Sequence, residues 1–157
     1  MVLRSRSLIR SILLGGLVAG TIDIGAACLI NGLGLVTILQ AIASGVLGRA
    51  SFHRGLPAAA LGLGLQWAMS ILVAAIFVTA SQLLKLPRRR WIATGLAYGA
   101  VTFVVMNYAV LPLSAVRHAP HFTARSLIEN MLAMLLFGLI ISFFARGSSR
   151  GWRSSVR

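Results

Sequence analysis

The chain has 157 residues, of which 58% are hydrophobic and 11% charged, and its mean hydropathy is +0.90. This composition excludes a soluble globular domain and is typical of a single-domain polytopic membrane protein. The net charge of +13 would suggest a nucleic-acid partner in a soluble protein, but the basic residues lie between long apolar runs, so we attribute them to membrane topology and expect no nucleic-acid partner.

The first apolar run, residues 11–30, is long enough to cross a bilayer, which takes about 20 helical residues. Its basic flank is similar to that of a signal peptide, and the "AAC" triplet ending at Cys28 is faintly similar to a lipoprotein cleavage site. Gly25 stands where such a site has leucine, and Asp23 interrupts the apolar region, so we expect a retained helix. Cys28 is the single cysteine, which excludes an internal disulfide.

Residues 35–47, "LVTILQAIASGVL", follow, with apolar residues at helical spacing and Thr37, Gln40 and Ser44 on the other side. Thirteen residues are too few to cross a membrane. We therefore expect an interfacial or re-entrant helix on the outer side, with Gln40 facing solvent or lipid headgroups. This segment could form a lid over whatever lies beneath it.

Three further runs complete the expected fold: residues 56–84, 91–111 and 126–145. The run 56–84 is longer than a perpendicular span needs, so its helix is tilted or begins in the headgroups, and Pro57 suits a first helical turn. We predict an all-α fold in which residues 1–147 form one domain of four transmembrane helices. Residues 148–157 form a basic, flexible tail that lies on anionic headgroups.

The basic residues predict the orientation of these spans. With both termini in the cytoplasm, eleven basic residues lie inside and four outside, as the positive-inside rule requires. The inner ones are Arg4, Arg6, Arg10, Lys85, Arg88, Arg89, Arg90, Arg146, Arg150, Arg153 and Arg157, and the outer ones are Arg49, Arg54, Arg117 and Arg125. Trp91, which follows "PRRR", is expected to anchor its helix at the cytoplasmic interface.

Small residues indicate where the helices pack together. Gly16 and Gly20 in the first span, and Gly95 and Gly99 in the third, form GxxxG motifs, which allow helix backbones to approach closely in lipid. Asp23 lies on the same side of its helix as the first motif, at i±3, i±4 and i±7 spacing. Its carboxylate is therefore expected to face neighbouring helices, with lipid on the other side.

Polar residues predict a pocket in the outer half of the membrane. A carboxylate in the bilayer normally marks a cavity or a partner, and Asp23 lies roughly 10 Å below the outer end of its helix. Each of the other spans also places strongly polar side chains in that leaflet, whereas the inner half offers only hydroxyls, which argues against a conducting channel. The expected pocket residues are Asp23, Asn107, Gln40, Gln66, Glu129 and Asn130.

Each of these residues also has a structural interpretation. Glu129 could complete a capping box with Ser126, or pair with Arg125 one turn away. Asp23 could form an ion pair with Arg49 or Arg125, and the asparagines could hold helices together by interhelical hydrogen bonds.

No metal or cofactor site is expected from the sequence. His53, His118 and His121 lie on outer loops, but Pro120 breaks the helical spacing of the last two and no thiolate or loop carboxylate assists them. We also find no phosphate loop, HExxH or GxSxG motif. An intramembrane enzyme that uses Asp23 with an outer histidine is a minority hypothesis.

Three segments, "GTIDI" at 20–24, "ILQAIASGVLG" at 38–48 and "LAYGAVTFVVMNYAVLPLS" at 96–114, carry a resemblance to known proteins. Together they resemble a family of small, uncharacterised bacterial inner-membrane proteins with four predicted spans, distantly similar to the YagU-like proteins. The resemblance covers about residues 20–147. It implies an inner-membrane location and no assigned activity, and it places Asp23, Gln40 and Asn107 inside the family-like motifs.

Three classes of function are compatible with these features. The first is a non-enzymatic membrane protein that associates with itself or with a larger complex through its glycine faces, with a polar pocket open to the outer side. The second is a small transporter or proton-coupled carrier that uses Asp23. The third is a lipid- or quinone-binding protein or an intramembrane enzyme.

Overall fold

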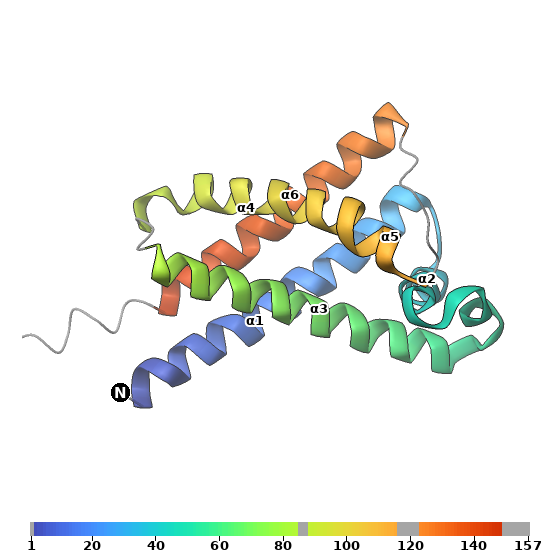
Figure 1. Cartoon of the computed structure of the whole chain (residues 1–157), viewed down its shortest axis with the longest axis horizontal. Helices are drawn as coiled ribbons and strands as arrows, with labels where there is room; N and C mark the ends of the chain where they lie inside the picture. The colour runs from blue at the N-terminus through green and yellow to red at the C-terminus, as the bar shows by residue number, and fades with distance from the viewer. Residues whose placement is uncertain (1, 85–87, 116–122, 149–157) are drawn as a thin grey trace, which may run out of the picture.

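The computed structural model of the chain describes residues 2–84, 88–115 and 123–148. All the secondary-structure elements in these ranges are helices. Four of the helices are long, and short elements connect or extend them (Figure 1). The long ones are α1 (Val2–Asn31), α3 (Gly55–Leu83), α4 (Trp91–Val105) and α6 (Ala124–Ser148). The remaining elements are α2 (Leu35–Leu47), η1 (Gly48–His53), η2 (Arg88–Arg90), η3 (Met106–Val110) and α5 (Leu111–Leu113).

Among the described residues, five helical stretches are long and apolar enough to cross a membrane. Four of them correspond to the predicted spans, of which 56–84 ends one residue early, at Leu83, and the fifth is Leu35–His53, in which α2 continues into the 3-10 helix η1. The predicted helix of 35–47 is thus extended to 19 residues. Gly48, with a φ of 63°, lies at the junction of α2 and η1, where the left-handed backbone favours glycine.

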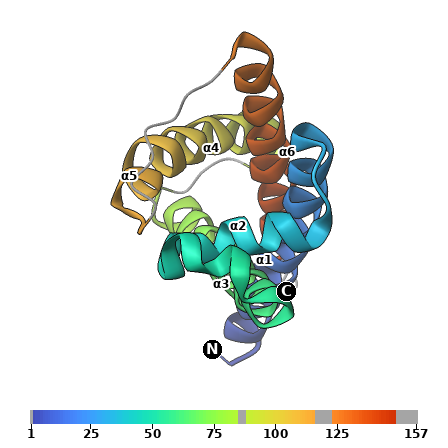
Figure 2. The same cartoon turned by 90° about the vertical axis from the view of Figure 1, so that its right-hand side faces the viewer.

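The long helices run along the length of the molecule, and α2 lies across one end of them (Figures 1 and 2). This end also holds the last residues of α1, the first residues of α3, and α5. The opposite end holds the start of α1, the end of α3, the start of α4 and the end of α6. The segments predicted to be cytoplasmic therefore meet at one end of the bundle, and the segments predicted to be external meet at the other.

Helix neighbours in space do not follow the order of the chain. The most extensive contacts join α4 to α6, α6 to α1, α1 to α3 and α3 to α2. A buried cluster of Ala19, Val73, Ala74, Phe77, Phe137 and Ile141 lies where α1, α3 and α6 meet. Consecutive helices α3 and α4 meet through the Tyr98 side chain, which donates a hydrogen bond to the Val73 carbonyl at 2.7 Å and packs against Phe77 at 4.8 Å.

The predicted GxxxG motif of the third span lies at the crossing of α4 and α6. A Cβ atom on Gly95 would lie 2.9 Å from Ser142 Cβ, and one on Gly99 would lie 2.8 Å from Leu135 Cα. Gly138 on α6 completes the crossing, because its own Cβ would meet the backbone of Gly95 and Gly99. Close backbone approach of this kind stabilises helix pairs in lipid through van der Waals contact.

The motif of the first span lies between α1 and α3. A Cβ on Gly16 would lie 2.7 Å from Ile71 Cα, and one on Gly20 would lie 2.5 Å from the Ser70 hydroxyl. Gly15 points to a different helix, with Phe144 Cβ of α6 3.2 Å from its would-be Cβ. Both predicted glycine faces are thus covered by helices of the same chain, which removes the basis for expecting a second copy to bind there.

The third long helix in the sequence, α4, changes geometry before it ends. Residues Met106–Val110 form a π-helical turn, in which the Leu111 N–H bonds to the Met106 carbonyl, and α5 follows without a break. Pro112 explains the change, since proline has no N–H and its ring clashes with the carbonyl four residues earlier. The predicted span of 91–111 therefore continues to Leu113 and contains Asn107 in an irregular turn.

Candidate functional site

Two of the predicted pocket residues are joined across the interface of α1 and α3. The Gln66 side-chain amide donates a hydrogen bond to Asp23 Oδ2 at 2.8 Å. Asp23 lies eight residues before the end of α1 at Asn31, which corresponds to a depth of about 12 Å at 1.5 Å per residue. Both residues were among the predicted pocket residues, but the sequence gave no indication that they contact each other.

The Asp23–Gln66 pair belongs to a polar strip that follows the same interface. One turn nearer the start of α1, Gly20 leaves room for the Ser70 hydroxyl. On the exposed side, Trp67 Nε1 donates to the Thr21 hydroxyl at 3.2 Å. These contacts favour one register of α1 against α3, because a shift of either helix would break several of them at once.

Apolar clusters lie on both sides of this polar strip. Toward α2, the buried residues Ile24, Ile38, Leu39 and Ala59 pack together, with Ala27, Cys28, Ile42 and Leu63 against them. Toward the opposite end lies the core cluster that contains Ala19, Val73 and Phe137. Helix α2 therefore covers the end of the α1–α3 interface with hydrophobic side chains, as a lid would.

Gln40 was predicted to face solvent or headgroups, and this is wrong. Its side chain is buried, with 8% of its surface exposed, and its amide donates to the Gly55 carbonyl at 3.1 Å. Close packing explains the burial, because Gly62 of α3 lies directly against the Leu39 backbone of α2. The polar side of α2 thus forms a hydrogen bond to α3.

The two asparagines bond within their own helices. Asn107 donates to the Phe103 carbonyl at 2.8 Å, and Asn130 donates to the Ser126 carbonyl at 2.7 Å. Each bond joins residues four positions apart, where an amide side chain reaches a carbonyl of the preceding turn. These hydrogen bonds are intrahelical, in contrast to the interhelical bonds that we expected.

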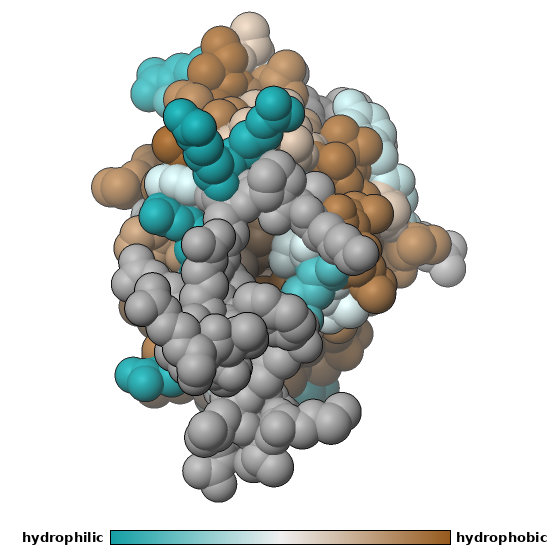
Figure 3. Space-filling model, turned by 90° about the vertical axis from the view of Figure 1, so that its left-hand side faces the viewer, coloured by the Kyte–Doolittle hydropathy of each residue, from teal (hydrophilic) through white to brown (hydrophobic). Residues whose placement is uncertain are grey.

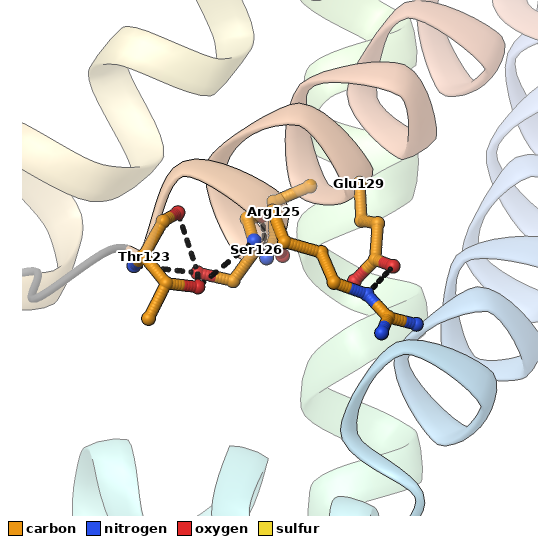
Figure 4. Close-up of polar contacts among 5 residues, drawn as sticks. Thr123, Arg125, Ser126 and Glu129 are labelled. Carbon is orange, nitrogen blue, oxygen red and sulfur yellow. Dashed lines mark hydrogen bonds and ion pairs between the residues drawn. The ribbon is translucent and has the colours of Figure 1, made fainter.

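Glu129 forms an ion pair with Arg125 at 2.8 Å, as one of the two structural interpretations predicted (Figure 4). The capping box forms three residues earlier than predicted. The Thr123 hydroxyl accepts the Ser126 N–H at 3.2 Å, and the Ser126 hydroxyl accepts the Thr123 N–H at 3.0 Å. This reciprocal pair satisfies two backbone donors and begins α6 at Ala124 instead of residue 126.

The expected ion pair of Asp23 with an arginine is absent from the part of the chain that the structure describes. Arg125 is bonded to Glu129, and Arg49 is exposed on η1. A neutral amide, Gln66, occupies the place of the expected cation. Of the six predicted pocket residues, the structure thus links Asp23 with Gln66, and the hydrogen bonds of the other four are made elsewhere.

Within residues 2–84, 88–115 and 123–148, no group of three or more His, Cys, Asp or Glu side chains could hold a metal ion. His53 ends η1 and is exposed. His118 and His121 lie outside the described residues, as do Arg117 and the tail from residue 149 onward.

Sequence reasoning missed several residues that shape this region. Gly62 and Gly138 lack a GxxxG partner in their own helices, and Thr123 was assigned to a loop. Ser51 in η1 is fully buried, and its hydroxyl has no hydrogen-bond partner among the described residues. The sequence around Ser51 does not indicate that this side chain is buried.

Comparison of the chain with protein-family models, with curated proteins and with solved structures finds no match.

Proposed function

We propose that the chain is a four-span bacterial inner-membrane protein with both termini in the cytoplasm. The position of α2 across the ends of the long helices supports an interfacial role for α2 and four crossing helices (Figures 1 and 2). The charge distribution supports the orientation, because the arginine-rich segments gather at the opposite end. The bacterial location rests on the resemblance to the four-span family.

In this membrane the protein acts as a non-enzymatic accessory or structural subunit. One observation carries this conclusion: the polar side chains of the predicted pocket form hydrogen bonds to one another or to nearby backbone, and no acid–base or nucleophilic grouping is found among the described residues. Catalysis needs a nucleophile, acid or base held within reach of a substrate. Here Asp23, Gln66 and Gln40 join helices, and the other polar groups bond within their own helix.

The partner surface of such a subunit is the outer face of α4. Helix α4 packs extensively against one helix, α6. Its other side exposes large apolar residues, including Val101 at 58%, Val104 at 51% and Val105 at 48%. A second copy of the chain, or a helix of a larger complex, would pack on this face.

Site-specific photocrosslinking in native membranes tests this surface. A benzophenone side chain at Val104 should give a protein adduct, whereas one at Phe103, which is 3% exposed on the same helix, should not. Recovery of monomer alone from Val101, Val104 and Val105 would defeat the proposal.

A carrier that uses Asp23 is the second candidate. The observation that favours it is a carboxylate within a membrane-crossing stretch, bonded to a neutral amide with no cation to balance it among the described residues. Replacement Asp23→Asn keeps the shape and the hydrogen bond to Gln66 while removing the charge. Loss of proton or substrate flux in proteoliposomes would support this function, and unchanged flux would eliminate it.

A further inference from the structure

An apolar groove lies among α1, α4 and α6, near the end of the molecule where the chain begins. It has a volume of about 270 Å³, it is open on one side, and it is lined by Val18, Trp91, Leu139, Ile140, Phe143 and Phe144. Its volume falls just below the roughly 300–1,000 Å³ of typical small-molecule pockets. A groove of this size and lining suits a section of one hydrocarbon chain.

An arginine stands over the aromatic wall of this groove. The Arg146 guanidinium lies 4.7 Å from the centre of the Trp91 ring and 5.8 Å from that of Phe143. The two rings lie edge-on to each other at 6.0 Å, and the Ser142 hydroxyl donates to the Trp91 carbonyl at 2.8 Å. These contacts hold α4 and α6 together here and fix the position of the guanidinium.

Stacking on an aromatic ring uses the face of a guanidinium, whereas its hydrogen bonds form in the plane of the group. Arginine therefore suits the recognition of phosphate oxygens beside aromatic surface. Arg10, Arg89 and Arg90 are exposed in segments at this same end of the molecule. Figure 3, which looks onto this end, shows hydrophilic side chains next to hydrophobic surface.

We propose that this groove is a binding site for an anionic phospholipid, with one acyl chain against Val18, Ile140 and Phe144 and the phosphate at Arg146. Charge complementarity selects this occupant: the walls are apolar and the rim is cationic, which matches a lipid with a negative headgroup and matches neither a soluble anion nor a neutral lipid. The site stands apart from the proposed subunit function, because it uses neither the outer face of α4 nor Asp23.

Quenching of Trp91 fluorescence by lipids with brominated acyl chains tests the site. The full chain carries Trp67→Phe and Trp152→Phe, so that Trp91 is the single tryptophan, and it is purified in detergent. Brominated phosphatidylglycerol should quench at about fivefold lower concentration than brominated phosphatidylcholine with the same chains. This factor corresponds to the ~1 kcal/mol that one basic residue contributes near an anionic surface.

Two variants separate the headgroup contact from the chain contact. Arg146→Gln should abolish the preference for phosphatidylglycerol, while Arg54→Gln, which removes the same charge at the opposite end of the molecule, should leave it intact. Val18→Phe should fill the groove and weaken quenching by both lipids, and the 37% exposure of Val18 makes the larger side chain tolerable for folding.

The proposal is overturned if the two lipids quench equally, if Arg146→Gln keeps the preference, or if Val18→Phe leaves quenching unchanged. Competition by soluble glycerol 3-phosphate as strong as that by phosphatidylglycerol would also overturn it, because the groove would then add nothing to binding.

Discussion

The close approach of α2 to α3 predicts a large difference between two alanine variants on the same helix. Gly62 is buried, and a Cβ there would overlap the Leu39 carbonyl oxygen and lie 2.7 Å from its carbon. Gly64, two residues further on, has no atom within 4 Å of its would-be Cβ. Both residues lie in the interior of α3, so the gain of ~1 kcal/mol in helix propensity from glycine to alanine is shared by both variants.

The expected difference in stability between the two variants is therefore the steric cost at Gly62. Overpacking typically costs about 1–3 kcal/mol, and the upper part of this range applies because the obstructing atoms belong to backbone and cannot rotate away. Gly62→Ala should therefore be about 2–3 kcal/mol less stable than Gly64→Ala. Titration of helical circular dichroism with sodium dodecyl sulfate, in dodecyl maltoside micelles, measures this difference.

The rate at which the Cys28 thiol is labelled provides a second test of the close approach of α2 to α3. Cys28 is the single cysteine, and it packs against the cluster that α2 and α3 form with α1. Displacement of α2 in Gly62→Ala should speed labelling of this thiol, and Gly64→Ala should react as the wild type does. Equal stability of the two variants within about 0.5 kcal/mol, the usual range for neutral surface changes, together with equal labelling, would refute the close approach.

Three further predictions concern polar groups. Ser51→Ala should raise the free energy of unfolding by about 1 kcal/mol, since it removes a buried hydroxyl without a described partner, and a loss of stability would show that this hydroxyl has a hydrogen-bond partner. Gln66→Leu should destabilise the protein by about 1–3 kcal/mol in the same titration, because it leaves the Asp23 carboxylate without its amide, whereas Asp23→Asn should be tolerated. Thr123→Ala should cost about 1 kcal/mol and increase hydrogen exchange at the Ser126 amide; unchanged exchange would argue against the capping box.

The spans could be predicted because length and hydropathy determine them. Each of the four expected spans coincides, to within one residue at its end, with part of a helical stretch long and apolar enough to cross a membrane, and the short helix begins and ends at Leu35 and Leu47 as expected. The π-helical turn was missed although its signal is in the sequence: Pro112 comes shortly after Asn107 in an apolar run. A proline in this position therefore predicts a local change of helix geometry as well as a helix end.

The site was harder to predict because its contacts join distant segments. Periodicity placed Asp23 on the glycine side of α1, which is where the structure has it, but the choice of Gln66 as partner depends on how α1 and α3 align. Gly138 shows the same limit. Its role in α6 depends on the two glycines of α4 that it meets, and no spacing within α6 reveals them.

The arrangement of neighbours has a consequence for the biogenesis of the protein. Both α1 and α4 make their most extensive contacts with α6, which is synthesised after both of them. Until then Tyr98 contacts α3, but the glycine face of α4 is uncovered in the lipid. A nascent chain that stalls before residue 124 therefore exposes to lipid the surfaces of α1 and α4 that α6 covers in the folded chain, and membrane quality control can recognise it by these surfaces.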